Sequence, residues 1–249
     1  MGHKQTENLP VWLYWEGDLP DWINECQNTV FAHASNVYLL TPESFNALRD
    51  VDLDISIEDL YVAHRADFIR AFLLAKYGGL WIDSDCLVLK SLQPVLDILE
   101  HYAFIGYRER SGEVTNNFMG ACEYSIIAAN YYKRVCDILR AGETIEWLTL
   151  GSKALTATLD ESLTTWYELK VELVQPICWS NPGAFLHKRE DGAHNEVFNT
   201  ESYCYMLSSN MIGGYLRDND YPNLLDQQTF FSFLLRASKT NTEPHLATV

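Results

Sequence analysis

Positive charge is scarce in this chain of 249 residues. Its 18 lysine and arginine residues face 34 aspartate and glutamate residues, which gives a formal net charge of −16. A nucleic-acid-binding surface needs clustered cations that neutralise phosphates, so this balance argues against a nucleic-acid partner. It also argues against docking on anionic lipid through a basic patch. An anionic substrate would need a local cation or a bound metal ion.

Paired cysteines and long apolar runs are also absent. The six cysteines are scattered, with no Cys-x-x-Cys pair, which predicts buried reduced thiols rather than a disulfide framework. No apolar run reaches the length of a membrane span, and the opening MGHKQTENLP lacks the apolar core of a signal peptide. We therefore expect a cytoplasmic protein with no transmembrane segment, and we leave peripheral contact with the inner membrane face open.

Strand and helix patterns alternate in the first third of the chain. Short buried strands are expected at 11–15, 37–40 and 80–83. Between them, helices are expected from Asp21, from Pro42 and from Ser56, the last of which ends at Gly78-Gly79. This alternation predicts an α/β fold with a mostly parallel sheet, in which ligands gather beyond the carboxyl ends of the strands.

The second half of the chain is less regular. It predicts strands within 102–109 and 167–179, helices at 125–142 and within 224–239, and a loop-rich segment at 193–213. No internal repeat or linker-like change of composition is visible. We therefore expect a single domain over 1–240, followed by a flexible tail at 241–249.

Two aspartates, Asp83 and Asp85, end the run GGLWIDSD. Side chains one residue apart on an extended segment point to opposite sides, but they can converge once the strand turns into a loop. Mn²⁺ and Mg²⁺ prefer oxygen ligands and take one or two carboxylates, with water and substrate phosphate in the remaining positions. The plain alternative is a solvated turn. Similarly, Asp67 and Arg70 lie three apart on the preceding helix, where a surface ion pair is the plain alternative.

The segment HRADFIRAFLLAKYGGLWIDSDCLVL resembles the central motif of glycosyltransferases with a GT-A fold and a D-x-D signature. The nearest types are the capsular-polysaccharide-synthesis enzymes and the fungal mannosyltransferase-like enzymes of family 32, with the large clostridial glucosylating toxins as distant relatives. Their motif runs Ser/Ala-Asp-x-x-Arg, Leu-x-x-x-Gly-Gly and aromatic-x-Asp-x-Asp. It is filled here by Ala66, Asp67, Arg70, Leu74, Gly78, Gly79, Trp81, Asp83 and Asp85.

The resemblance implies a GT-A, Rossmann-like nucleotide-sugar-binding fold and a role for each matching residue. Asp85 would bind Mn²⁺ or Mg²⁺ directly, and Asp83 would contact the metal shell and the donor's ribose or sugar. Asp67 and Arg70 would hydrogen-bond the donor sugar, with Arg70 also near the phosphates. The four residues Asp67, Arg70, Asp83 and Asp85 would thus form the catalytic set.

Weaker similarities extend the donor site. The run VWLYWEG resembles the opening strand of the same enzymes, which places Trp15 and Gly17 near the nucleotide, although Trp15 can equally be a core aromatic. In VTNNFMGAC, Asn116 or Asn117 would lie near the donor sugar, and we assign the role to Asn117. His64 is expected to be structural.

The implied reaction is metal-dependent transfer of a sugar from a UDP- or GDP-sugar to a saccharide or lipid-linked saccharide, with retention of configuration, in surface glycan or polysaccharide synthesis. Two alternatives remain. One is a non-catalytic module that binds a nucleotide sugar or glycan. The other is a phosphatase of the haloacid-dehalogenase type. In that motif Asp-x-Asp is followed, two positions later, by threonine or valine, where this chain has Leu87.

Overall fold

The computed structural model describes residues 6–49, 55–142, 144–188, 198–219 and 221–240. The chain divides into two compact units, which are described separately. The first consists of Met1–Gly17, Asn36–Asp83 and Gln93–Val171, and the second of Asp18–Ser35, Ser84–Leu92 and Glu172–Val249. The single domain expected for 1–240 stays a prediction, and the tail expected at 241–249 lies outside the described residues.

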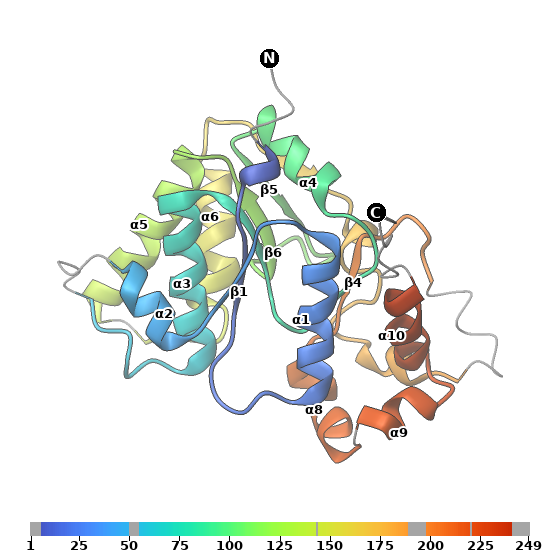
Figure 1. Ribbon diagram of the computed structural model, residues 1–249. Coiled ribbons are helices and arrows are strands. Elements are labelled where there is room, and N and C mark those ends of the chain that lie inside the picture. Colours follow the sequence, from blue (N-terminus) through green and yellow to red (C-terminus); the bar gives the residue numbers. More distant parts are fainter. Residues whose placement is uncertain (1–5, 50–54, 143, 189–197, 220, 241–249) are drawn as a thin grey trace, which may run out of the picture. The chain divides into compact units, whose positions relative to one another are not determined.

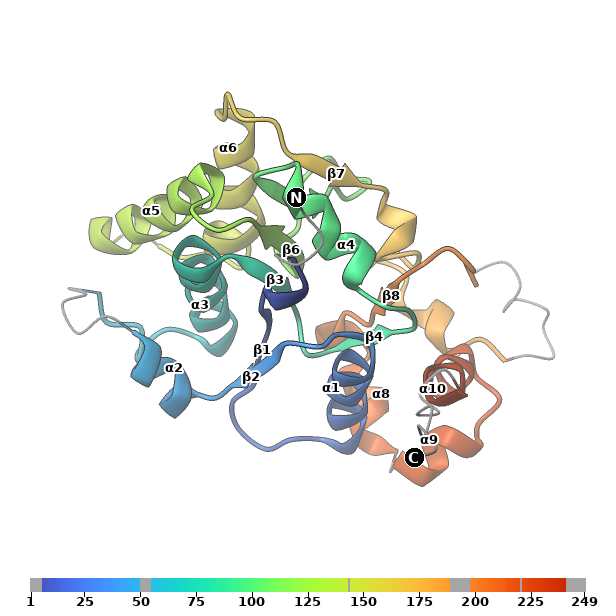
Figure 2. The same ribbon diagram turned by 45° about the horizontal axis from the view of Figure 1, so that its top comes forward.

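A mixed six-stranded sheet organises the first unit (Figures 1 and 2). Its strand order is β2-β1-β3-β6-β5-β7. Parallel pairs join β1 to β2, β1 to β3 and β5 to β7, whereas β6 runs antiparallel to β3 and β5. The strands are β1 (Val11–Tyr14), β2 (Val37–Leu40), β3 (Gly79–Ile82), β5 (Phe104–Tyr107), β6 (Phe118–Ala121) and β7 (Tyr167–Leu169). The α/β class with a mostly parallel sheet is confirmed, although the antiparallel strand β6 was not anticipated.

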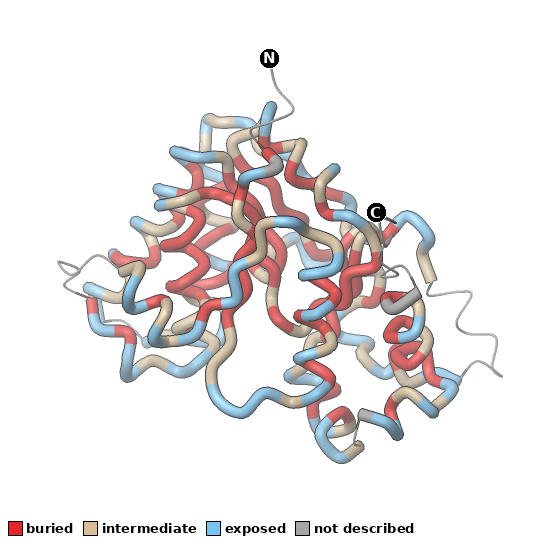
Figure 3. The backbone as a smooth tube through the Cα atoms, viewed as in Figure 1, coloured by how far each residue is buried: buried red, intermediate tan, exposed pale blue. Residues whose placement is uncertain are grey.

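Helices α3, α5 and α6 lie side by side against this sheet (Figure 2). The hydrophobic core of the unit is formed by buried side chains of these helices and of the strands. Figure 3 shows buried residues concentrated along the strands and along α3. The helical elements of the unit are η1 (Thr6–Asn8), α2 (Pro42–Leu48), α3 (Val62–Tyr77), α4 (Gln93–Asp97), η2 (Ile98–Glu100), α5 (Ile126–Ala141), the π-helical turn η3 (Thr149–Lys153) and α6 (Ala154–Asp160).

The turn from α3 into β3 requires its two glycines. Gly78 and Gly79 have φ angles of +65° and +96°, which side chains rarely adopt. A Cβ atom on Gly79 would lie 2.1 Å from the backbone oxygen of Pro10. The indole of Trp12 donates a hydrogen bond of 2.8 Å to the Gly78 carbonyl, which ties the turn to β1. The two glycines therefore allow the chain to pass directly from α3 into β3, which lies in the middle of the sheet.

The start of α3 differs from the expectation. The helix begins at Val62 with Tyr61 as its N-cap, and not at Ser56. The hydroxyl of Ser56 instead donates to the Glu58 carboxylate at 2.7 Å. Arg65 donates to the carbonyl oxygens of Glu58 and Leu60, which holds the preceding segment in a non-helical turn. By contrast, α2 has the predicted start, with Thr41 as a capping-box N-cap and Pro42 at the first helical position.

The second unit is built around a two-stranded antiparallel pair, β4 (Cys86–Val88) with β8 (Cys204–Met206). Helices α1 and α10 pack on β4. The helical elements here are α1 (Asp21–His33), η4 (Val171–Leu173, at the boundary of the units), η5 (Pro182–Leu186), α8 (Ser209–Asp218), α9 (Tyr221–Asp226) and α10 (Phe230–Thr240). The segment expected to be loop-rich thus contributes β8 and the start of α8, and the predicted last helix is divided into α9 and α10.

All six cysteines are free, and Cys26, Cys86, Cys136 and Cys204 are buried, as predicted. Cys122 and Cys178 are partly exposed. Over the described ranges, no helix combines the length and the apolar character that crossing a bilayer requires.

Candidate functional site

Three charged residues named from the sequence meet in the first unit. Asp67 and Arg70 lie one turn apart on α3 and are both buried, at 7% and 6% exposure. The Nη2 atom of Arg70 lies 3.1 Å from Oδ1 of Asp83 and 3.8 Å from Oδ1 of Asp67. Asp83 directly follows β3, and its side chain is 27% exposed. One guanidinium therefore joins two carboxylates, of which only Asp83 reaches the surface appreciably.

Trp81 fixes both partners of this ion pair. Its indole Nε1 donates a hydrogen bond of 2.7 Å to Oδ1 of Asp83. The guanidinium carbon of Arg70 lies 4.9 Å from the centre of the Trp81 ring, which is the distance of a cation–π contact. Trp81 is 1% exposed, so it holds the pair from the buried side, while the Asp83 carboxylate stays partly open to water. The aromatic position of the motif thus holds the Arg70–Asp83 pair in place.

The two asparagines have different tasks. Asn116 is buried, and its Nδ2 donates to Oδ1 of Asp67 at 2.6 Å, while its carbonyl accepts from Nη1 of Arg70 at 2.7 Å. Asn117 accepts at its carbonyl from the backbone N of Asp83, 2.8 Å away. The side-chain oxygen of Asn117 accepts from the Tyr107 hydroxyl at 2.7 Å. Asn116 therefore completes what we call the polar cluster: Asp67, Arg70, Asp83 and Asn116.

Burial is the main influence on the ionisation of Asp67. It raises the pKa of the Asp67 carboxyl, and the opposing effects of Arg70 and of the Asn116 hydrogen bond offset this only in part. Burial also raises the pKa of the Tyr131 hydroxyl, with a contribution from the negative charge of Asp67. That hydroxyl donates to the carbonyl of Leu150 at 2.9 Å. A buried ionisable group of this kind is typical of functional sites.

Asp85 belongs to the second unit and has other partners. Its Oδ2 accepts from the backbone N of Ser209 at 2.8 Å, at the first residue of α8. Its carbonyl accepts from the backbone N of Leu207 at 3.1 Å. Ser208, between them, has a positive φ of 54°. Part of the segment expected to be loop-rich at 193–213 thus lies against Asp85, which it meets through the backbone amides of Leu207 and Ser209.

The strand β1 ends at Tyr14, one residue before the expected end, so Trp15 and Gly17 both lie beyond its carboxyl end. The backbone N of Trp15 donates to the carbonyl of Leu40 at 3.0 Å, and Gly17 has a φ of +86°. Between them, Glu16 forms a two-pronged ion pair with Arg65 of α3, with both N–O distances at 3.0 Å. This pair ties the end of β1 to α3. The roles of Trp15 and Gly17 toward a nucleotide stay predictions.

The donor atoms suit a hard divalent cation. Asp83 and Asp85 supply carboxylate oxygens, the ligands that Mg²⁺ and Mn²⁺ prefer. Among the residues that the structure describes, no cluster of three or more His, Cys, Asp and Glu side chains could hold a metal ion.

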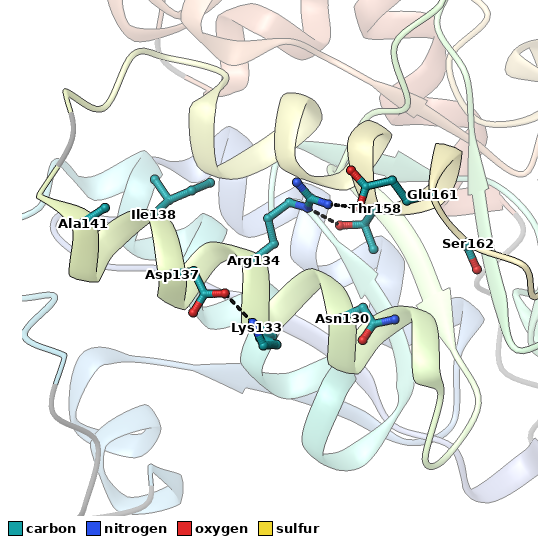
Figure 4. A pocket seen from close by; sticks show the side chains of 9 residues that line it. All are labelled: Asn130, Lys133, Arg134, Asp137, Ile138, Ala141, Thr158, Glu161 and Ser162. Atoms are coloured by element: carbon teal, nitrogen blue, oxygen red, sulfur yellow. Dashed lines mark hydrogen bonds and ion pairs between the residues drawn. The ribbon is translucent and has the colours of Figure 1, made fainter.

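A groove of about 500 Å³ lies between α5 and α6 (Figure 4). Its charged side chains neutralise one another: Lys133 and Asp137 are 2.6 Å apart, and Arg134 pairs with Glu161. None of the residues named from the sequence lines it. The polar cluster, in which one cation faces two carboxylates, is the stronger candidate for chemistry.

The site residues assigned from the sequence omitted two contributors to the cluster. Asn116, which was left as an alternative to Asn117, is the residue that bonds Asp67. Gly151 was given no role, although a Cβ atom there would lie 2.7 Å from Nδ2 of Asn116. The absence of a side chain at Gly151 makes room for Asn116.

The sequence model of a family described as "Capsular polysaccharide synthesis protein" matches residues 2–142, which is more than half of the chain. The chain is 29% identical over 126 residues to O-glycosyltransferase PaGT of Phomopsis amygdali, covering 45% of this chain and 30% of that protein. It is also 29% identical over 126 residues to inositol phosphoceramide mannosyltransferase 3 of Schizosaccharomyces pombe, covering 47% and 34%. The chain spans about a third of the length of these curated relatives.

Solved glycosyltransferases share the fold. The apo form of the glycosyltransferase GlyE of Streptococcus pneumoniae aligns with a TM-score of 0.54 at 14% identity, covering 93% of this chain and 60% of that one. The bifunctional glycosyltransferase WbbM, in its apo form, aligns with a TM-score of 0.52 at 11% identity, covering 98% and 51%. At such low identity the likeness establishes the fold alone, which is GT-A-like, as expected.

Proposed function

This chain belongs to the capsular polysaccharide synthesis protein family, and from that premise we propose that it is a metal-dependent glycosyltransferase. It would move a sugar from a nucleotide-sugar donor to a hydroxyl group of a saccharide or lipid-linked saccharide in glycan synthesis. With a lipid-linked acceptor, the reaction would take place at a membrane surface, on its cytoplasmic side. The family match and the GT-A-like fold support this class of activity.

The polar cluster carries the proposal. In the first unit, a buried guanidinium is fixed between Asp67 and the partly exposed Asp83, just past the carboxyl end of β3. Ligands bind at this edge in sheets of this kind. Burying a guanidinium and two carboxylates together has a large desolvation cost. Apolar residues of similar volume would fill the same space without that cost if these groups had only a structural role. The arrangement therefore favours a binding role for these groups.

Each site residue would have a separate role toward the donor or the metal ion. Asp67 and Asp83 would accept hydrogen bonds from hydroxyl groups of the donor, and Arg70 would offset negative charge near its phosphates. Asn117 would line the donor-sugar side, and Trp15 and Gly17 would approach the nucleotide. Asp83 and Asp85, one residue apart in the chain, would hold Mn²⁺ or Mg²⁺. The bound ion would offset the charge that develops on the departing nucleoside diphosphate.

The stereochemical course is part of the proposal. We propose that configuration is retained, with the acceptor hydroxyl attacking from the face that the diphosphate leaves. In this course the departing diphosphate takes the acceptor's proton, so that the protein does not need a separate carboxylate base. Measurement of the anomeric configuration of the first product by NMR tests this point, and an inverted product would contradict it.

The experiment that tests the function is release of nucleoside diphosphate from a panel of UDP-, GDP- and TDP-sugars. Wild type, Asp85→Asn and a control, Asp226→Asn, would be compared with Mn²⁺, with Mg²⁺ and with a chelator. Asp226 is exposed on α9 and serves as a matched loss of one carboxylate in the same unit. We expect metal-dependent release from one donor, lost in Asp85→Asn and kept in the control.

Other outcomes would point elsewhere. Binding of a nucleotide sugar without any release would favour a non-catalytic module. Release of phosphate from simple phosphomonoesters would favour a phosphatase. If the protein neither binds any donor nor releases nucleoside diphosphate from any donor, the proposed function is overturned.

A further inference from the structure

Two exposed aromatic rings meet at the N-terminal end of α3, within the first unit. Tyr61 is 58% exposed and Trp147 is 51% exposed, although both are large apolar side chains. Their ring centres are 6.0 Å apart with the planes inclined by 52°. Single exposed aromatic residues are ordinary, but a contiguous pair presents a surface that water solvates poorly. Such a surface is typical of a place where a partner binds.

A third ring adds a polar atom without a partner. His64 packs against Tyr61 with ring centres 6.0 Å apart and planes at 73°. It is 9% exposed, and its Nε2 has no hydrogen-bond partner within the described part of the chain. Buried polar atoms of this kind cost free energy, and in native proteins each one calls for an explanation. Because this atom is buried, an ordered water held beneath a hydroxyl-bearing ligand would supply the missing partner.

These three residues, which we call the aromatic platform, adjoin the polar cluster by two routes. Along α3, His64 is followed three and six residues later by Asp67 and Arg70, so that all three share one face of the helix. From Trp147 the chain continues into η3, where Gly151 lies against Asn116 of the cluster. The platform is therefore continuous with the site at which the donor sugar is proposed to bind.

The surrounding charge limits what the platform can bind. Glu146 adjoins Trp147 in the chain and Glu58 lies three residues before Tyr61, both exposed, in a protein of net charge −16. Each of these carboxylates is paired with a cation, Glu146 with Lys153 at 2.7 Å and Glu58 with Arg49 at 3.2 Å, so these cations are engaged and offer little to an anionic ligand. An uncharged pyranose ring has a face of C–H groups that stacks on tyrosine and tryptophan, and a rim of hydroxyl groups that form hydrogen bonds. These properties match both the exposed rings and the unpartnered nitrogen.

We propose that Tyr61, His64 and Trp147 form an acceptor subsite that binds an uncharged sugar ring by stacking, beside the polar cluster. The subsite rests on the proposed glycosyltransferase function, of which it identifies the acceptor side. It assigns binding rather than chemistry to these residues. Their loss would therefore weaken the binding of saccharides and leave the binding of the nucleotide sugar in place.

Saturation-transfer NMR on the full chain tests this subsite. The probes would be methyl glycosides of glucose, mannose and galactose, with methyl glucuronide as a charged comparison. In Trp147→Ala we expect binding of the preferred neutral glycoside to weaken about fivefold or more, a loss typical of one aromatic stacking contact. Trp147→Phe should keep most of the binding. Trp179→Ala, a matched control whose ring is 49% exposed in the second unit, should bind like wild type.

Tyr61→Ala removes the other ring from a different element and should weaken binding in the same direction, which guards against a folding defect in one variant. Binding that is equal in wild type, Trp147→Ala and Tyr61→Ala would overturn the subsite. So would tighter binding of the glucuronide than of every neutral glycoside, or no glycoside binding by wild type. Binding and hydrolysis of nucleotide sugars, measured on the same samples, report on the proposed function separately.

Discussion

Asp83 and Asp85 are separated by one residue, but their surroundings contrast. In the first unit, the Asp83 carboxylate forms an ion pair with Arg70 and accepts a hydrogen bond from the Trp81 indole. Arg70 also contacts Asp67 and the backbone carbonyl of Asn116. In the second unit, the Asp85 carboxylate receives one backbone amide at the start of α8. The first aspartate is thus fixed by a network of buried side chains, whereas the second, within the described ranges, is fixed by backbone amides.

The difference separates two uses of a short motif. A carboxylate paired with a buried guanidinium and an indole anchors core side chains, so its replacement disturbs folding as well as binding. A carboxylate that meets only a helix terminus adds little to stability and keeps more of its coordination capacity for a ligand. We call Asp83 and the side chains around it (Asp67, Arg70, Trp81 and Asn116) the Asp83 side, and Asp85 with its backbone partners the Asp85 side. Substitutions on the Asp83 side should lower stability strongly, whereas substitutions of Asp85 should lower activity with little loss of stability.

Arg70→Met should have the largest effect on stability. It leaves the buried Asp67 and the partly buried Asp83 without their cation and removes the contact with Trp81. Breaking a buried ion pair from one side typically costs about 3–5 kcal/mol. Urea unfolding measures this loss. Arg140→Met is the control, since Arg140 pairs with Asp137 on the surface of the same unit and exposed pairs contribute about 0–1 kcal/mol. Equal losses in the two variants would contradict the comparison.

Gly151→Ala should disturb the polar cluster at Asn116. The added Cβ would lie 2.7 Å from Nδ2 of Asn116, which must move and weaken its hydrogen bond to Asp67. Overpacking of this kind typically costs about 1–3 kcal/mol. Gly183→Ala is the control, because a Cβ at Gly183 meets no atom within 4 Å. Thermal unfolding of both variants measures the difference, and a Gly151→Ala protein as stable as the control would exclude this role for Gly151.

Asp67 gives the Asp83 side a distinctive dependence on pH. Burial raises the pKa of its carboxyl in the folded state above the ordinary value of 3.8. The folded protein therefore holds this proton more tightly than the unfolded chain, and the stabilisation is complete below the unfolded pKa and lost as pH rises through the folded pKa. Asp67→Asn should remove this decline in the free energy of unfolding, which denaturant titrations at several pH values would measure.

Asp137→Asn provides a control of opposite sign. The hydrogen bond from Lys133 lowers the pKa of the exposed Asp137 carboxyl, so that its contribution is present at higher pH and lost as pH falls through the folded pKa. The two variants should therefore change the pH profile in opposite directions. A change in the same direction would show that burial does not control the ionisation of Asp67.

The sequence predicted the Asp83 side of the site better than the Asp85 side. Asp67 and Arg70 are spaced for one helix face, and Gly78-Gly79 fixes the turn that delivers Asp83, so local rules suffice. Asn116 and Gly151 meet through contacts distant in the sequence, which no local pattern encodes. The strand β8 and the start of α8 were read as loop because β8 has three residues and its partner β4 lies more than a hundred positions away.

Asp85→Asn should have the smallest effect on stability and the clearest effect on function. The asparagine oxygen can still accept the hydrogen bond from Ser209, so only the attraction between a negative charge and the N-terminus of α8 is lost. That attraction is worth about 0.3–1 kcal/mol. Asp83→Asn, which also weakens the ion pair with Arg70, should lose more. Urea unfolding of the two variants, measured beside nucleotide release, compares the aspartates directly. A stability loss in Asp85→Asn as large as that in Asp83→Asn would show that both carboxylates are structural, and would remove the reason to assign the cation mainly to Asp85.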